Sequence, residues 1–199
     1  MLYELKDCRT GNRETERKTT VDIRSDGKEV TFVFKAENCK FYCPFNTYNA
    51  IHSCGDACEV LIGSDPKRKT YYEIEVSANG DVMLAKMVYL GEQSDGKGGV
   101  KILLDIGFEK DCFVKAETKR LGDGYETRLK VPLDKVCTGE GEIYFNAYRI
   151  DTDGGKFLHD DQLLYALNPT MRNKFHTPDK YVYLKDYAEE NVKDKGERK

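Results

Sequence analysis

Apolar and polar residues alternate in several short runs of this chain, which is the period of a β-strand with one buried face. In residues 125–131 the odd-numbered side chains are Tyr, Thr, Leu and Val, whereas the even-numbered ones are charged. In residues 70–76, positions 72, 74 and 76 are apolar and positions 73 and 75 are glutamates. We predict core strands over 30–36, 70–76, 125–131 and 142–150.

Turn residues separate these runs, and amphipathic helices are almost missing from the pattern. Asn79-Gly80 is a dipeptide typical of a tight hairpin, and a second hairpin turn lies in residues 121–124. Short strands with turn signals between them predict an all-β fold, a two-sheet antiparallel β-sandwich. A chain of 199 residues suits one domain. We expect a polar N-terminal arm over 1–18, the sandwich over 19–184 and a charged tail over 185–199.

The composition narrows the classes of partner. The net charge is −3 and 34% of the residues are charged, so the surface is mixed in sign and lacks the basic face of a nucleic-acid-binding protein. No run approaches the roughly 18 apolar residues of a membrane span, and the first residues do not resemble an export signal. We therefore expect no nucleic acid partner, no membrane partner and a cytoplasmic location.

The seven cysteines are an odd number, which excludes complete pairing within the chain. In a cytoplasmic protein we expect reduced thiols. Cys39, Cys43, Cys54 and Cys58 leave two alternatives open. Four thiolates can close a tetrahedral zinc site. Their spacing of three intervening residues differs from the C-x2-C of zinc knuckles, however, which favours partly buried thiols in and beside strands.

Several phrases, in order along the chain, resemble the family-nine carbohydrate-binding modules. They are TYYEIEVSANG at 70–80, RLKVPL at 128–133, FNAYRID at 145–151, NPT at 168–170 and FHTP at 175–178. The family is a β-sandwich that binds sugar without catalysis, often at chain ends and often with structurally bound calcium. The resemblance therefore implies a carbohydrate partner, and it makes calcium the one cofactor to consider.

The resemblance places the sugar site at the end of strand 142–150 and in the loop that follows. A pyranose lays its apolar C–H faces on aromatic rings, and its hydroxyls need fixed donors and acceptors, which Arg, Asn and carboxylates supply. The chain has no tryptophan to stack on a sugar, and Leu167 stands before Asn168 where the family commonly has one. A tyrosine would take that role. The predicted ligand-binding residues are Arg149, Asn146, His176, Tyr148, Tyr165 and Glu73.

Some of these residues also have a structural interpretation. Arg149 is either a ligand donor or a buried strut paired with Asp151. His176 is either a site residue or a hydrogen-bonded corner residue. Asp151 and Asp153 belong to an oxygen-rich loop that is either a calcium site or a plain turn. Asn146 either faces a cleft or satisfies backbone groups at a bulge.

No motif indicates catalysis. Glu73 and Glu75 are two residues apart on what we expect to be an exposed strand face, and nothing marks them as the acid and nucleophile of a glycosidase. A Ser-His-Asp order, a phosphate-binding loop and an HExxH motif are missing from the sequence. We therefore predict a non-catalytic carbohydrate-binding protein and no enzyme. The alternative is a structural or protein-interaction scaffold that kept the sandwich and lost sugar binding.

Overall fold

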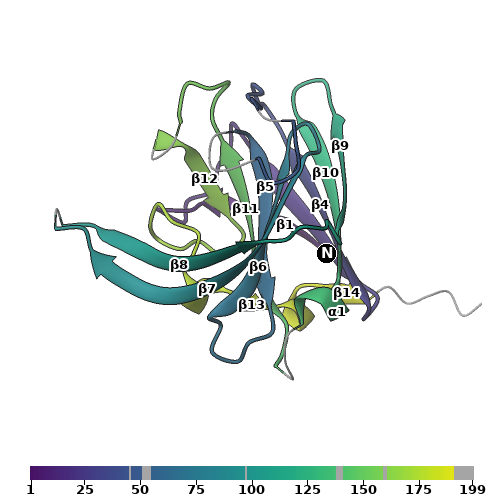
Figure 1. Cartoon of the computed structure of the whole chain (residues 1–199). Coiled ribbons are helices and arrows are strands. Elements are labelled where there is room, and N and C mark those ends of the chain that lie inside the picture. The colour runs from purple at the N-terminus through teal and green to yellow at the C-terminus, as the bar shows by residue number, and fades with distance from the viewer. Residues whose placement is uncertain (45, 51–54, 97, 138–140, 159–160, 191–199) are drawn as a thin grey trace, which may run out of the picture.

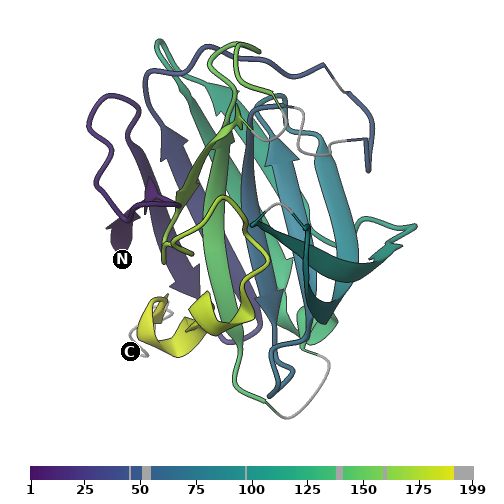
Figure 2. The ribbon, with the colours of Figure 1, turned by 90° about the vertical axis from the view of Figure 1, so that its left-hand side faces the viewer.

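Two β-sheets pack face to face in this chain (Figure 1). The structure is a computed structural model that describes residues 1–44, 46–50, 55–96, 98–137, 141–158 and 161–190. Figure 2 shows the same two layers after a turn of 90°. The architecture confirms the predicted all-β, two-sheet antiparallel sandwich, and all four predicted core strands are strands.

The first sheet has the strand order β1-β3-β4-β10-β9, and β14 lies beside β3. All its pairs are antiparallel except β14 with β3, which is parallel. The strands of this sheet are β1 (Leu2–Glu4), β3 (Thr19–Ser25), β4 (Glu29–Ala36), β9 (Lys115–Arg120), β10 (Tyr125–Pro132) and β14 (Glu189–Glu190).

The second sheet has the order β2-β12-β11-β5-β6-β7-β8, and β13 lies beside β11. Figure 1 shows that the long β7–β8 hairpin extends beyond the rest of the sandwich. The strands of this sheet are β2 (Lys6–Asp7), β5 (Ala57–Gly63), β6 (Thr70–Ser77), β7 (Val82–Ser94), β8 (Val100–Phe108), β11 (Tyr144–Asp151), β12 (Leu163–Ala166) and β13 (Val182–Tyr183).

The helical elements named in the described part of the chain are single turns: α1 (Leu133–Val136) and the 3-10 turns η2 (Pro178–Lys180) and η3 (Leu184–Asp186). Among the described residues, no helix has the length and apolar character needed to cross a membrane.

Apolar side chains from both sheets meet in the core. The ring of Phe32 in β4 lies 5.5 Å, centroid to centroid, from the ring of Phe145 in β11. Strand β10 buries every second residue, as its alternation predicts. In contrast, every residue of β5 and β11 is buried. The reason is a second apolar cluster on the outer face of the second sheet, to which Phe175 and Tyr181 contribute from the loop after β12.

The sheets extend beyond the bounds 19–184 that we expected for the sandwich. Residues 1–18 supply β1 and β2, which pair with β3 and β12, and Leu5 between them lies in the core. Thus the first part of this segment belongs to the sheets, although we expected a polar arm, whereas residues 9–18 are exposed or partly exposed. Strand β14 adds two residues from the expected tail to the first sheet. Strands of two or three residues are held by backbone hydrogen bonds to a neighbour, and side-chain periodicity gives no signal for them.

Six of the seven cysteines lie in the described part of the chain, and all six are free thiols. Cys54, the fourth residue of the alternative zinc set, lies outside the described residues. Cys39 and Cys58 are buried, and Cys43 is partly buried. Cys58 lies in β5, whereas Cys39 and Cys43 lie in the connection between β4 and β5. Their burial agrees with the structural alternative for this cysteine group.

Candidate functional site

The outer face of the second sheet is the side that points away from the first sheet. Alternation along each strand places Tyr71 and Glu73 of β6 on this face, together with Tyr148 of β11, while their chain neighbours point into the core. Glu59 of β5 lies directly opposite Tyr148 on one side and opposite Glu75 of β6 on the other. The loop of residues 167–181 covers part of this face.

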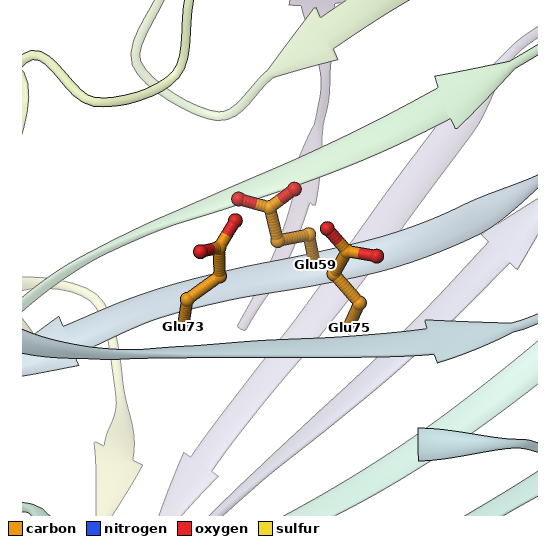
Figure 3. A group of neighbouring side chains, drawn as sticks. All are labelled: Glu59, Glu73 and Glu75. Atoms are coloured by element: carbon orange, nitrogen blue, oxygen red, sulfur yellow. The ribbon is translucent and has the colours of Figure 1, made fainter. Parts of the chain in front are cut away.

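Three carboxyl groups come together on the outer face (Figure 3). Glu59, Glu73 and Glu75, here termed the glutamate cluster, are only 1%, 7% and 4% exposed. This corrects the expectation that Glu73 and Glu75 lie on an exposed strand face. The solvent-facing side of an isolated strand pair becomes an interior when a distant loop packs over it, and local alternation cannot predict that loop.

Burial controls the protonation of the cluster. It raises the pKa of Glu73 to about 8. Burial also raises the pKa of Glu59 well above its ordinary value, and the neighbouring charges of Glu73 and Glu75 add to the effect. The pKa of Glu75 is likewise raised by burial and by Glu73. Three carboxylates this close and this buried cannot all carry a negative charge unless a positive charge joins them.

His176 lies beside this cluster. Its Nε2 atom is 3.6 Å from Oε1 of Glu73, and its Nδ1 atom is 2.9 Å from the hydroxyl of Tyr71. Burial lowers the pKa of His176 to about 4, so the imidazole is neutral at neutral pH. In the tautomer with the proton on Nε2, the Tyr71 hydroxyl donates to Nδ1. His176 therefore holds the corner by hydrogen bonding and does not supply a counter-charge.

Asn146 and Tyr148 fix the covering loop to β11. The side-chain amide of Asn146 donates to the carbonyl of Asn168 at 2.8 Å, and its Oδ1 accepts from the backbone N–H of Asn168 at 3.1 Å. The Tyr148 hydroxyl donates to the carbonyl of Phe175 at 3.0 Å. The two rings are stacked with centroids 4.1 Å apart. Both side chains of β11 are completely buried, so they position the loop.

Arg149 lies on the opposite, inner face and is 0% exposed. Its Nη2 atom is 2.8 Å from Oδ2 of Asp151, and its Nη1 donates to Oγ1 of Thr19 at 2.8 Å. The guanidinium lies over the ring of Tyr165, with Cζ 5.7 Å from the ring centroid. These contacts are those of the buried strut, one of the two alternatives that the sequence left open.

The loop that was predicted to bind calcium has its carboxylates paired with basic side chains. Arg17 contacts Oδ1 of Asp153 at 3.0 Å and Oδ2 of Asp151 at 3.5 Å. Lys40 lies 3.6 Å from the same Asp153 oxygen. Because cations of the chain already neutralise these oxygens, the residues do not fit a calcium ion. The contacts describe a turn braced by ion pairs, and calcium at this loop stays a prediction without structural support.

The structure thus divides the six predicted ligand-binding residues between two faces. Arg149 and Tyr165 pack into the interior on the inner side of the second sheet, whereas the other four lie on the outer side. They do not form one site. Side chains two apart on a strand share a face and adjacent ones do not. Tyr148 and Arg149 are adjacent, so they point to opposite faces of the sheet and do not contribute to one site on either face.

A half-exposed group that the sequence did not predict lies further along the outer face. The Tyr89 hydroxyl donates to Oε1 of Glu92 at 3.1 Å, and Nη1 of Arg172 donates to the same oxygen at 2.6 Å. Nε of Arg172 donates to Oγ1 of Thr177, next to His176. We call Tyr89, Glu92 and Arg172 the hairpin cluster. No local pattern joins residues 80 positions apart, so only the fold reveals it.

Comparison with known proteins shows the fold alone. No family model matches the chain, and no curated protein matches its sequence. A candidate carbohydrate-binding protein of Bacteroides uniformis ATCC 8492 is similar in structure, with a TM-score of 0.67 and 13% identity over 91% of this chain and 84% of that one. A carbohydrate binding module family 9 from Caldicellulosiruptor kristjanssonii, in complex with glucose, has a TM-score of 0.51 and 13% identity over 90% and 82%. The resemblance to family nine is confirmed at the level of the fold.

Proposed function

We propose that this chain is a non-catalytic carbohydrate-binding protein whose sugar lies on the outer face of the second sheet, against the hairpin cluster. One observation carries the proposal. The cluster presents a flat ring, a carboxylate and a guanidinium on one open face, from the β7–β8 hairpin and the covering loop. The side chains of Arg172 and Glu92 are 32% and 28% exposed, so a ligand in solvent can reach them.

The chemistry of this group suits a sugar. Tyr89 is partly buried against the outer apolar cluster and offers a ring face on which the C–H groups of a pyranose can lie. Within the described residues Arg172 uses Nη1 and Nε, so its second terminal nitrogen can donate to adjacent hydroxyls or a carboxylate of the ligand. Charge-assisted bonds of this kind orient a sugar more strongly than neutral ones.

The fold supports the same function. Both similar structures are described as carbohydrate-binding, and one was solved with glucose. Among the residues predicted from the sequence, Asn146, Tyr148 and His176 act in this proposal by holding the loop that carries Arg172. Arg149 takes a structural role. The site therefore lies on the outer face, beyond the strand end where the sequence placed it.

The missing tryptophan favours a second candidate function. A tyrosine ring gives less stacking area than the indole on which this family relies, so we expect weak binding. A scaffold that kept the sandwich and lost its sugar is the alternative that this feature supports.

A glycan array followed by calorimetry on mono- and oligosaccharides tests the proposal. The unmodified chain should bind at least one sugar class, and Arg172→Ala should weaken that binding about 10–100-fold, the equivalent of one charge-assisted bond. Arg24→Ala is the matched control, because Arg24 is also an ion-paired arginine but lies on the first sheet. Absence of binding across the array would leave only the scaffold. Equal weakening by the two variants would remove the hairpin cluster from the site.

A further inference from the structure

The glutamate cluster is an anomaly that sugar binding does not explain. Its residues come from two paired strands: Glu59 of β5 faces Glu75 of β6, and Glu73 lies two positions further along β6. In Figure 3 the carboxyl groups of all three turn toward one another. One ligand oxygen from each lies within 4.8 Å of the other two.

Two of these side chains have buried oxygens without a partner. Oε1 of Glu59 and Oε2 of Glu75 form no hydrogen bond within the described part of the chain, and neither residue forms an ion pair there. Buried polar atoms in native proteins nearly always have partners, because leaving one without costs free energy. The carboxyl groups that carry these oxygens turn toward the cluster in Figure 3, so the missing partner belongs there.

No Lys or Arg of the described residues forms an ion pair with the three glutamates. The residues opposite Glu73 and Glu75 in β7 are Ala85 and Met83, and Tyr148 lies opposite Glu59 in β11. The one basic side chain that contacts the cluster in the described part of the chain is His176, whose Nε2 lies 3.6 Å from Oε1 of Glu73 and leaves the other two carboxyl groups without a basic partner. The three carboxylates are buried, so they would attract a cation more strongly than carboxylates at the surface do, because electrostatic attraction grows as the local dielectric constant falls.

Protons shared between the carboxyl groups explain the glutamate cluster less well than a bound cation does. Carboxyl groups that share a proton form a short direct bond of about 2.5–2.7 Å between oxygens, and no hydrogen bond joins any two of these three side chains in the structure. A cation between the three carboxylates would neutralise them together and give the oxygens a partner. Carboxylate oxygens suit hard cations, and Ca²⁺ accepts a flexible coordination geometry, whereas Mg²⁺ demands near-ideal octahedral geometry and gives up its waters reluctantly.

We propose that Glu59, Glu73 and Glu75 bind one hard divalent cation, Ca²⁺ in preference to Mg²⁺, between β5 and β6. The ion joins the two central strands of the second sheet beneath the covering loop. Glu73 is the most exposed of the three and lies beside the partly exposed side chain of His176, which marks the side from which an ion enters. The site does not involve the hairpin cluster, so it stands or falls independently of sugar binding.

Calorimetry on the full chain tests this site. Protein is dialysed against a chelator, transferred to metal-free buffer at mildly alkaline pH without sugar, and titrated with CaCl₂. We expect one Ca²⁺ per chain, weaker binding of MgCl₂, and a melting temperature that rises by about 5–10 °C at about a hundredfold excess over Kd. No heat and no shift in melting temperature with Ca²⁺ would overturn the proposal.

Isosteric variants then assign the site. Glu59→Gln and Glu75→Gln should abolish the Ca²⁺ response. Without metal they should melt at or above the temperature of the chelated parent chain, because each removes a buried carboxyl group without a partner. Glu117→Gln, at an exposed glutamate of β9, and Asp153→Asn, in the loop predicted to bind calcium, should keep the response. Loss of the response in Asp153→Asn with retention in Glu59→Gln would overturn the proposal in favour of that loop.

Discussion

Arg149 and Asp151 lie two positions apart on β11, with 2.8 Å between Nη2 and Oδ2 and with neither side chain exposed to solvent. Arg149 also joins the two sheets, because its Nη1 donates to Oγ1 of Thr19 in β3. Oδ1 of Asp151 accepts from the backbone N–H of Asp153 in the turn that follows β11. A guanidinium in this position is part of the interior, and its removal leaves a buried carboxylate with fewer partners.

Arg149→Ala should therefore lower the free energy of unfolding by about 3–5 kcal/mol, the typical loss when one member of a buried ion pair is removed. Urea denaturation of the variant and the parent chain measures the difference. Arg24→Ala removes a half-exposed arginine paired with Asp22 and should cost no more than about 1 kcal/mol. Similar small losses in both variants would show that Arg149 is not a strut.

Tyr148 connects β11 to the covering loop in two separable ways. Tyr148→Phe keeps the ring on Phe175 and removes only the hydrogen bond to its carbonyl, so the loss of stability should be about 1–3 kcal/mol, as for a buried acceptor left without its donor. Tyr148→Ala also empties a buried aromatic site and should cost about 3–5 kcal/mol. Amide hydrogen exchange should show faster opening of residues 168–177 in both, and unchanged exchange there would contradict the proposed attachment.

The turn between β9 and β10 offers a paired test of the backbone. A Cβ atom on Gly124 would lie 1.9 Å from the carbonyl oxygen of Ala36, whereas one on Gly122 would meet nothing within 4 Å. Gly124→Ala must therefore disturb the pairing of Tyr125 with Ala36, at a cost of about 1–3 kcal/mol or more. Gly122→Ala should stay within about 0.5 kcal/mol of the parent chain. Equal midpoints in urea for the two variants would contradict the close approach at Gly124.

The sandwich could be predicted from the sequence because its signals are local. Strand β10 buries alternate residues, and the turn that precedes it is rich in glycine. The period of the strand and the turn residues therefore predict the same element. The outer face is different. Glu59 lies in β5, and the residues that cover this strand are determined by where the loop of residues 167–181 packs. That contact joins segments about a hundred residues apart.

The division of β11 into two faces was available from its period, but the assignment of the faces was not. Tyr148 and Arg149 are both completely buried, and apolar residues occur on both sides of the strand, so composition does not indicate which side faces the other sheet. The hairpin cluster could not be predicted from the sequence for another reason. Arg172 and Glu92 belong to irregular or glycine-flanked segments that carry no periodic signal, and only the assembled sheet brings them together.

The thiols should differ sharply in reactivity. Denatured, non-reduced protein should titrate close to the seven free groups expected from the sequence. Among the six described thiols of the native protein, the exposed Cys112 should react first with an alkylating reagent. Cys58 should react last, because burial raises its pKa to about 12 and only the thiolate is nucleophilic. Mass spectrometry of peptides after timed alkylation gives the order. Three disulfides in the denatured titration would contradict the reduced state.

Two tryptophan substitutions separate the site expected from the family from the site proposed here. The family commonly places its tryptophan at the position of Leu167, but that side chain packs in the core between the sheets. Leu167→Trp should therefore overfill the interior, lower stability by about 1–3 kcal/mol and leave sugar affinity unimproved. Tyr89 lies on the outer face with part of its surface open, so Tyr89→Trp adds stacking area where we place the sugar.

For Tyr89→Trp we expect tighter binding of any sugar found with the parent chain, by a factor of a few up to about tenfold, because an indole presents a larger ring to the pyranose and retains a donor for Glu92. Stability should change little at this partly exposed position. Calorimetry with the same sugar measures the affinity of both variants, and urea denaturation measures their stability. The reverse outcome, tighter binding by Leu167→Trp without loss of stability, would move the sugar to the strand end that the sequence first indicated.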